Sequence, residues 1–183
     1  MKRLILTSIL LIFCMMVFPN IGHSLGFEGF GGKIGLVMPD GGDNTIGFGA
    51  VGFLGYILPS LTALKAETSL EYWGNSSDFP GGSTNLSVVS ANGTAKYFFT
   101  SSGISPFAGA GIGLVFSRAS IKYKEQIFGL KDYSDSETDI DLNLVGGVDI
   151  PIGIGMKFTA EGKIAIGDAD WFQITGGILV MLK

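Results

Sequence analysis

Hydrophobic and polar residues alternate strictly along three stretches of the chain. From Leu64 to Tyr72 the charged side chains fall at odd positions and the large apolar ones at even positions. The same alternation runs through residues 139–150 and 154–166. A period of two residues places successive side chains on opposite faces of an extended strand. Each stretch therefore predicts a β-strand with one polar and one apolar face.

Extending this pattern along the chain predicts eight strands. Their ranges are 27–38, 44–58, 61–74, 84–99, 104–118, 137–150, 154–166 and 170–182. Each is long enough to cross a bilayer when tilted, since roughly 9–11 residues suffice. The short turns "LPS", "TSSG" and "PIG" alternate with "PDGGD", "NSSDFPGG", the segment 119–136 and "GDA". Short turns at one end and longer loops at the other are typical of bacterial outer-membrane barrels.

The alternation does not decide which face points inward, because a soluble lipocalin-like barrel encloses its apolar face around a ligand. Aromatic residues concentrate near the predicted strand ends, as two interfacial girdles of a membrane barrel require. They are Tyr56, Tyr97 and Phe99 toward the short turns, and Tyr72, Trp73, Phe116, Trp171 and Phe172 toward the longer loops. We therefore expect an all-β, eight-stranded antiparallel up-and-down transmembrane β-barrel with its polar face inside.

The predicted polar face carries nearly equal numbers of positively and negatively charged side chains, and Lys33 is one of the positive ones. Opposite charges in a closed lumen can pair, whereas an unpaired charge there is costly. We predict a structural charge network that fills the lumen, formed by Lys65, Glu67, Glu71, Lys96, Asp149, Lys157, Glu161 and Lys163. Eight strands leave an interior just wide enough for side chains, so this role is favoured over transport.

The stretch "IGFGAVGFLG" contains the spacing G-x-G-x-x-G at Gly47, Gly49 and Gly52. A dinucleotide-binding loop of that spacing needs a buried strand before it and a helix after it. Gly55 and Pro59 stand where the helix would run, which argues against a nucleotide site. Glycines on the polar face instead leave space for long charged side chains in a narrow lumen.

The chain begins with Lys2 and Arg3, continues uncharged from Leu4 to Phe18 and reaches small residues near Ser24. This pattern predicts a cleaved signal peptide at residues 1–24, followed by a barrel domain at residues 25–183. An uncleaved membrane anchor is disfavoured because the apolar run is short. Cleavage removes Cys14 and His23 and changes the formal charge from −4 to −6, which argues against nucleic acid as a partner.

Segments such as "SPFAGAGIGLVF", "VGGVDIPIGIGMKFTAEGKIAI" and "FQITGGILVML" follow one another as they do in small outer-membrane barrels. Residues 27–182 resemble the family of OmpA-like and OmpX-like eight-stranded barrel domains. The resemblance implies a bacterial outer membrane location, contact with outer-membrane lipid and lipopolysaccharide, and insertion by the barrel-assembly machinery. Family members usually end on an aromatic residue, whereas this sequence ends on Leu182 and Lys183.

Enzymes built on small outer-membrane barrels resemble one another in using a histidine as base, and residues 25–183 contain none. We therefore expect no catalysis and no cofactor. Asp135, Glu137, Asp139 and Asp141 are all at odd positions, so their carboxylates lie on one face of the predicted strand. This arrangement is compatible with a cation site, and equally with carboxylates that are solvated or paired with lysines. No glycine-turned calcium loop accompanies them, so no metal is predicted.

The segment 119–136, "ASIKYKEQIFGLKDYSDS", is the only predicted loop large enough for recognition. Its candidate contact residues are Lys122, Tyr123, Lys124, Phe128, Lys131 and Tyr133, whose cations suit lipopolysaccharide phosphates or an extracellular partner. We expect a structural or surface-interaction protein. A narrow passive pore and a soluble lipocalin-like ligand-binding barrel remain the alternatives.

Overall fold

The computed structural model describes residues 26–58, 60–123, 132–167 and 170–182. The strands are β1 (Gly29–Pro39), β2 (Thr45–Leu58), β3 (Leu61–Phe79), β4 (Gly82–Phe98), β5 (Ser105–Tyr123), β6 (Tyr133–Gly153), β7 (Met156–Ile166) and β8 (Trp171–Met181). Within these ranges no helix is long and apolar enough to span a membrane. The predicted signal peptide at residues 1–24 lies outside the described residues and stays a prediction.

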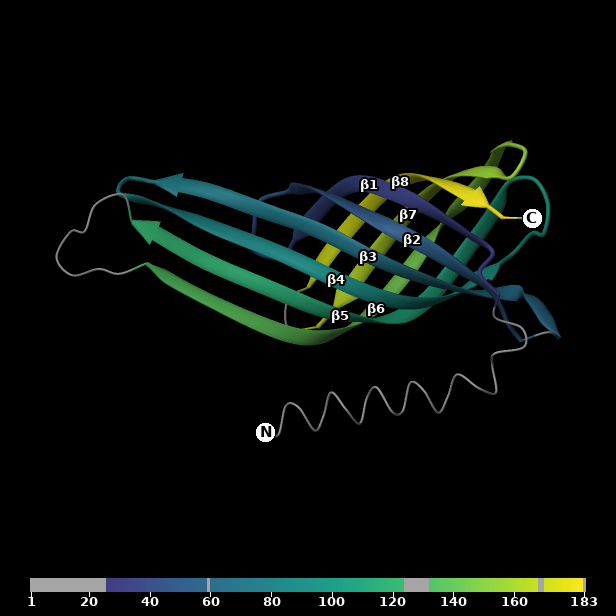
Figure 1. Ribbon diagram of the computed structural model, residues 1–183, viewed down its shortest axis with the longest axis horizontal. Coiled ribbons are helices and arrows are strands. Elements are labelled where there is room, and N and C mark those ends of the chain that lie inside the picture. The colour runs from purple at the N-terminus through teal and green to yellow at the C-terminus, as the bar shows by residue number, and fades with distance from the viewer. Residues whose placement is uncertain (1–25, 59, 124–131, 168–169, 183) are drawn as a thin grey trace.

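The eight strands form one closed ring (Figure 1). Each strand pairs antiparallel with the next, and β1 pairs with β8 over the register Gly29↔Met181 to Pro39↔Trp171. No strand edge is left open where the ring closes, which satisfies the backbone groups along the wall. The predicted all-β, eight-stranded antiparallel barrel is confirmed.

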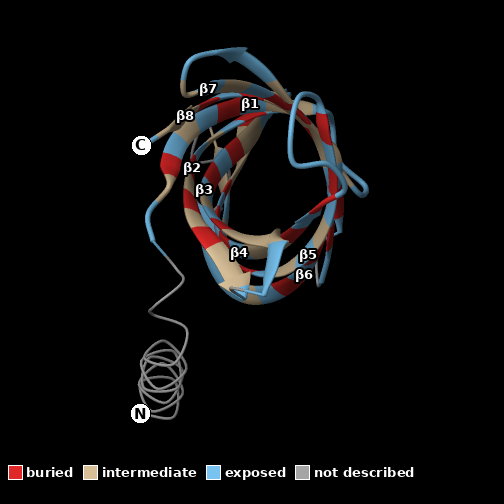
Figure 2. Cartoon of the chain, turned by 90° about the vertical axis from the view of Figure 1, so that its right-hand side faces the viewer, coloured by how far each residue is buried: buried red, intermediate tan, exposed pale blue. Residues whose placement is uncertain are grey.

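Buried and exposed residues alternate along every wall strand (Figure 2). Charged and amide side chains such as Lys96, Glu161 and Asn143 are buried inside, while Ile34, Ile112 and Ile140 are more than half exposed on the outside. An apolar exterior is stable only against a non-aqueous surrounding. The sequence alternation is therefore that of a barrel with its polar face inward.

Two glycines of the sequence motif make room for large lumen side chains. A Cβ on Gly47 would lie 2.8 Å from Val37 and 3.3 Å from Trp73, and one on Gly49 would lie 2.9 Å from the side chain of Glu71. The missing side chains let these neighbours occupy the narrow interior. The glycine spacing thus serves lumen packing.

A β-bulge in β2 corrects the predicted face of one residue. The register runs Phe53↔Glu67, Gly55↔Ala66 and Tyr56↔Lys65, and Gly55 takes a φ of 78°. The extra residue turns Tyr56 from the apolar face to the lumen side, opposite Lys65. The prediction of Tyr56 as an outward girdle residue is therefore wrong.

Two more predicted girdle residues lie inside the barrel. Trp73 and Trp171 are each only 4% exposed, and their ring centroids are 5.9 Å apart. Both fall on the inward parity of their strands, whereas Tyr72, Phe116 and Phe172 point outward and are exposed. The girdle near the longer loops therefore consists of the outward residues alone.

Strands β3 to β6 extend beyond the ring as a four-stranded sheet (Figure 1). We call it the projecting sheet; it includes residues 74–79 of β3 and 133–141 of β6. β3 pairs with β2 only up to Trp73, and β6 pairs with β7 only from Leu142 onward. The predicted loops were too long here, because "NSSDFPGG" is mostly strand with a turn at Gly81, whose φ is 104°. The predicted loop 119–136 likewise shortens to the residues between Tyr123 and Tyr133.

Candidate functional site in the barrel lumen

Four charged residues from four strands meet at the centre of the lumen. Lys33 comes from β1, Glu67 from β3, Lys96 from β4 and Glu161 from β7. The alternation of each strand turns these side chains inward, and all four are at most 6% exposed. We call them the lumen cluster.

The lumen cluster is a closed cycle of ion pairs. The Lys33 ammonium donates to Oε1 of Glu67 at 2.9 Å and to Oε1 of Glu161 at 3.0 Å. The Lys96 ammonium donates to Oε2 of Glu67 at 2.6 Å and to Oε2 of Glu161 at 2.5 Å. Every carboxylate oxygen has a partner, and the two positive and two negative charges balance.

A polar layer lies next to the lumen cluster, toward the projecting sheet. Lys163 pairs with Glu71, which also accepts from the Ser69 hydroxyl at 3.0 Å. The Asn143 amide donates to Oδ1 of Asn92 at 2.9 Å. These bonds continue the hydrogen-bonded filling of the interior.

Apolar side chains close the lumen on both sides of the charged layers. Toward the projecting sheet, the two indoles pack with Val37, Val88, Val115 and Ala165. Toward the short turns, Val51 and Phe53 pack with Leu179, while Phe98 and Phe107 pack with Val145. The Lys96 ammonium lies 4.5 Å from the centre of the Phe107 ring. Ion pairs held between apolar layers are shielded from water.

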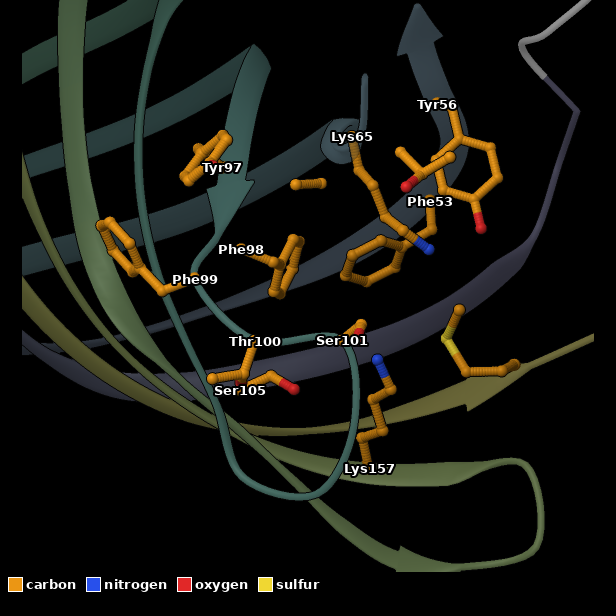
Figure 3. Close-up of a pocket in the computed structure, with 13 residues that line it drawn as sticks. Phe53, Tyr56, Lys65, Tyr97, Phe98, Phe99, Thr100, Ser101, Ser105 and Lys157 are labelled. Atoms are coloured by element: carbon orange, nitrogen blue, oxygen red, sulfur yellow. The ribbon is translucent and has the colours of Figure 1, made fainter. Parts of the chain in front are cut away.

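The short-turn end contains two further ion pairs and a cavity. Lys65 donates to Oε2 of Glu28 at 3.0 Å, and the Lys157 ammonium lies 3.6 Å from Oδ2 of Asp149. A cavity of about 360 Å³ lies between these two lysines (Figure 3). All eight residues predicted for the lumen network are thus inside the barrel, but they form separate clusters along it.

The sequence matches the family model described as "Outer membrane protein beta-barrel domain" over residues 7–174. The chain belongs to this outer-membrane β-barrel family. The match begins inside the predicted signal peptide, and a comparison with curated proteins found no match.

Solved structures of outer-membrane β-barrels share the fold. Neisserial surface protein A is 16% identical with a TM-score of 0.60, and the alignment covers 84% of this chain and 96% of that one. Ail, the attachment invasion locus protein of Yersinia pestis, is 13% identical with a TM-score of 0.56, covering 85% and 99%. A major outer membrane protein from Thermus thermophilus is 11% identical with a TM-score of 0.56, covering 84% and 99%. At these identities the likeness concerns the fold alone.

The predicted surface loop is only partly within the described residues of this outer-membrane β-barrel. Lys122 and Tyr123 form the end of β5, and Tyr133 begins β6. Lys124, Phe128 and Lys131 lie outside the described residues. Lys122 belongs to an outward row of β5, together with Arg118.

Sequence reasoning missed several residues of the lumen. Lys33 was placed on the charged face but not in the predicted network, although it bonds to both glutamates of the lumen cluster. The amides of Asn92, Asn143 and Gln173 are also buried there. Each of these residues occupies a position that the alternation along its strand turns inward, and this pattern could have identified all of them.

The acidic residues of β6 separate along the strand. Asp141 is 2% exposed and has an interaction partner, whereas Asp135 and Glu137 are exposed. In the described ranges no group of three or more histidine, cysteine, aspartate or glutamate side chains could hold a metal ion. The site in this part of the chain is therefore best described as a set of ion pairs.

Proposed function

We propose that this outer-membrane barrel is a non-enzymatic protein whose filled lumen stabilises the wall and whose projecting sheet contacts anionic saccharides at the cell surface. The proposal includes export through a signal peptide at residues 1–24 and insertion by the barrel-assembly machinery. The single observation that carries it is the projecting sheet of β3 to β6 with its outward cations.

Two exposed cations on the outer face of the sheet support an anionic partner. Among the described lysines and arginines, Lys33, Lys65, Lys96, Lys157 and Lys163 are ion-paired within the barrel. Arg118 and Lys122 instead lie exposed on the outer face of β5. They line a hollow of about 400 Å³ with Asn85, Ser87, Ser120 and Asp132. Cations beside hydroxyl and amide groups suit a phosphorylated saccharide.

The position of the cations favours the lipopolysaccharide headgroup as that partner. Arg118 follows the exposed girdle residue Phe116 by two positions on the same outward row. Aromatic girdles of barrels lie at the membrane interface, so the next outward residue is at headgroup level. Phosphates of lipopolysaccharide are the anions available there.

The test measures ligand stabilisation of the folded protein in nonionic detergent. A ligand that binds the folded state raises the temperature at which the compact gel band is lost. We expect lipopolysaccharide to raise this temperature and its dephosphorylated form to raise it much less. In the double variant Arg118→Gln/Lys122→Gln, the two forms of lipopolysaccharide should raise the temperature equally. In Lys157→Gln, the phosphorylated form should still raise it more. Equal stabilisation of the parent by both forms would refute the saccharide proposal.

A further inference from the structure

The cavity at the short-turn end has the dimensions and lining of a ligand site. Its volume of about 360 Å³ falls within the range of small-molecule pockets. Figure 3 shows Lys65 and Lys157 entering it from opposite sides, with Phe53 and Phe98 between them and Ser105 at the edge. The bulge at Gly55 adds the ring of Tyr56 to the same wall.

The charged groups of the lining are both cations. Lys65 belongs to β3 and Lys157 to β7, which are on opposite sides of an eight-membered ring. Their carboxylate partners, Glu28 and Asp149, do not line the cavity. Each ammonium has three donors, of which Lys65 uses one on Glu28. Within the described ranges the Lys157 ammonium donates no hydrogen bond, since Asp149 is 3.6 Å away.

The rest of the lining combines apolar surface with hydroxyl groups. Phe53 is 3% exposed and Phe98 9% exposed, so both rings are fixed by packing. Met181, Ser101 and Ser105 also line the cavity, and the Ser105 hydroxyl donates to the Gly103 carbonyl at 3.2 Å. Such a lining matches a molecule that has one anionic group and an apolar body.

We propose that this cavity binds a small organic anion, with its carboxylate between Lys65 and Lys157 and its apolar body against Phe53 and Phe98. The carboxylate would accept hydrogen bonds from both ammonium groups, in place of water. Glu28 and Asp149 balance the lysine charges, so the apolar contact has to contribute to affinity as well. The site is at the opposite end from the projecting sheet and is independent of the function proposed above.

The experiment compares an aromatic carboxylate with its uncharged amide. The exported protein is purified from outer membranes into nonionic detergent with isotopically labelled methionine methyl groups. Cinnamate should shift the NMR signal of Met181, which lines the cavity, in a saturable manner. Cinnamamide should shift it several-fold less at the same concentration. Met38 and Met156 lie outside the lining and serve as references.

Variants identify the charges responsible. Lys157→Gln should weaken cinnamate binding roughly fivefold to tenfold, because one charge-assisted hydrogen bond is lost. Lys157→Arg should retain most of the affinity, and Lys122→Gln, which removes an outward cation elsewhere, should leave it unchanged. If Lys157→Gln does not fold, the double variant Asp149→Asn/Lys157→Gln removes both charges of the pair and takes its place.

Two results would overturn the proposal. Equal responses of Met181 to cinnamate and cinnamamide would show that charge has no part in binding. Equal shifts of all three methionines would show partitioning of the probe into the detergent. Because lipopolysaccharide stabilisation is measured separately, either result leaves the function of the projecting sheet unaffected.

Discussion

At the residue scale, the charges of the lumen cluster stabilise one another because each lysine contacts both glutamates. Moving a charged group out of water is expensive, and the attraction of its partners offsets that cost only while the set is complete. Four-way pairing also fixes the relative positions of β1, β3, β4 and β7 across the ring. Removing any one member leaves an unbalanced charge in the lumen.

Glu161→Ala tests this dependence directly. The substitution should leave Lys33 and Lys96 sharing one carboxylate and lower the free energy of unfolding by about 3–5 kcal/mol. Denaturant titration in lipid vesicles, followed by tryptophan fluorescence, provides the measurement. Glu137→Ala, at an exposed position of β6, is the matched control. A Glu161→Ala protein as stable as the parent would show that the cluster contributes little.

Two glycines on neighbouring strands give a second residue-scale test. A Cβ at Gly49 would lie 2.9 Å from the Leu70 carbonyl oxygen, whereas one at Gly32 would find no heavy atom closer than 3.8 Å. Gly49→Ala should therefore cost about 1–3 kcal/mol through overpacking. Gly32→Ala should stay within about 0.5 kcal/mol of the parent. Equal effects in the same denaturant titration would contradict the packing role of Gly49.

At the element scale, the projecting sheet is held together by its own strand pairings and not by those that close the ring. Residues 74–79 of β3 have no ladder partner on β2, and residues 133–141 of β6 have none on β7. The sheet is instead held by the β3, β4, β5 and β6 ladders. Its end is mostly exposed, so it adds little buried apolar surface to the barrel.

Shortening the β5 to β6 hairpin tests this separation. Replacing residues 119–135 by Asn-Gly joins Arg118 to Ser136, which already lie opposite each other. The variant should still migrate as a compact band without boiling, because all wall pairings remain. It should also show a reduced response to lipopolysaccharide, since Lys122 is removed. Loss of the compact band would mean that the hairpin is needed for closure of the ring.

The strand pattern predicted the wall better than the projecting sheet. Alternation of apolar and polar residues marks a strand only where one face is buried, as from Leu64 to Tyr72. Residues 74–79 are mostly polar, so their pairing depends on backbone bonds that leave no hydrophobic pattern. The bulge at Gly55 was hidden for a similar reason, because one inserted residue shifts the parity without a change of composition.

Three of the four members of the lumen cluster were predictable from the sequence, whereas Lys33 was left out of the predicted network and the grouping of the charges was not predictable. Inward parity identified Glu67, Lys96 and Glu161, and balanced charge suggested that they pair. The sequence could not tell that Lys65 is drawn to Glu28 although it lies directly opposite Lys96. Partners across the lumen depend on strand stagger, which no local pattern reports.

At the scale of the whole molecule, stacked layers of side chains fill the lumen. The indole cluster, the amides, the lumen cluster and the phenylalanines succeed one another along the barrel axis. We therefore expect the lumen, as far as the described residues form it, to offer ions no continuous water path.

Single-channel recording in planar bilayers tests the filled lumen. The parent protein should show no steady open state, because conduction would require the lumen cluster to separate. Boiled protein added to the same membrane is the control for leakage caused by detergent. A steady current from folded protein alone would favour the narrow pore over the structural role.

The paired indoles provide a natural spectroscopic marker of assembly. The chain contains two tryptophans, and these belong to β3 and β8. Their rings approach to 5.9 Å only when distant parts of the sequence are joined into a ring. Two indoles so close couple their electronic transitions and should give a near-ultraviolet circular dichroism signal. Ring closure can therefore be timed during refolding without attaching a label.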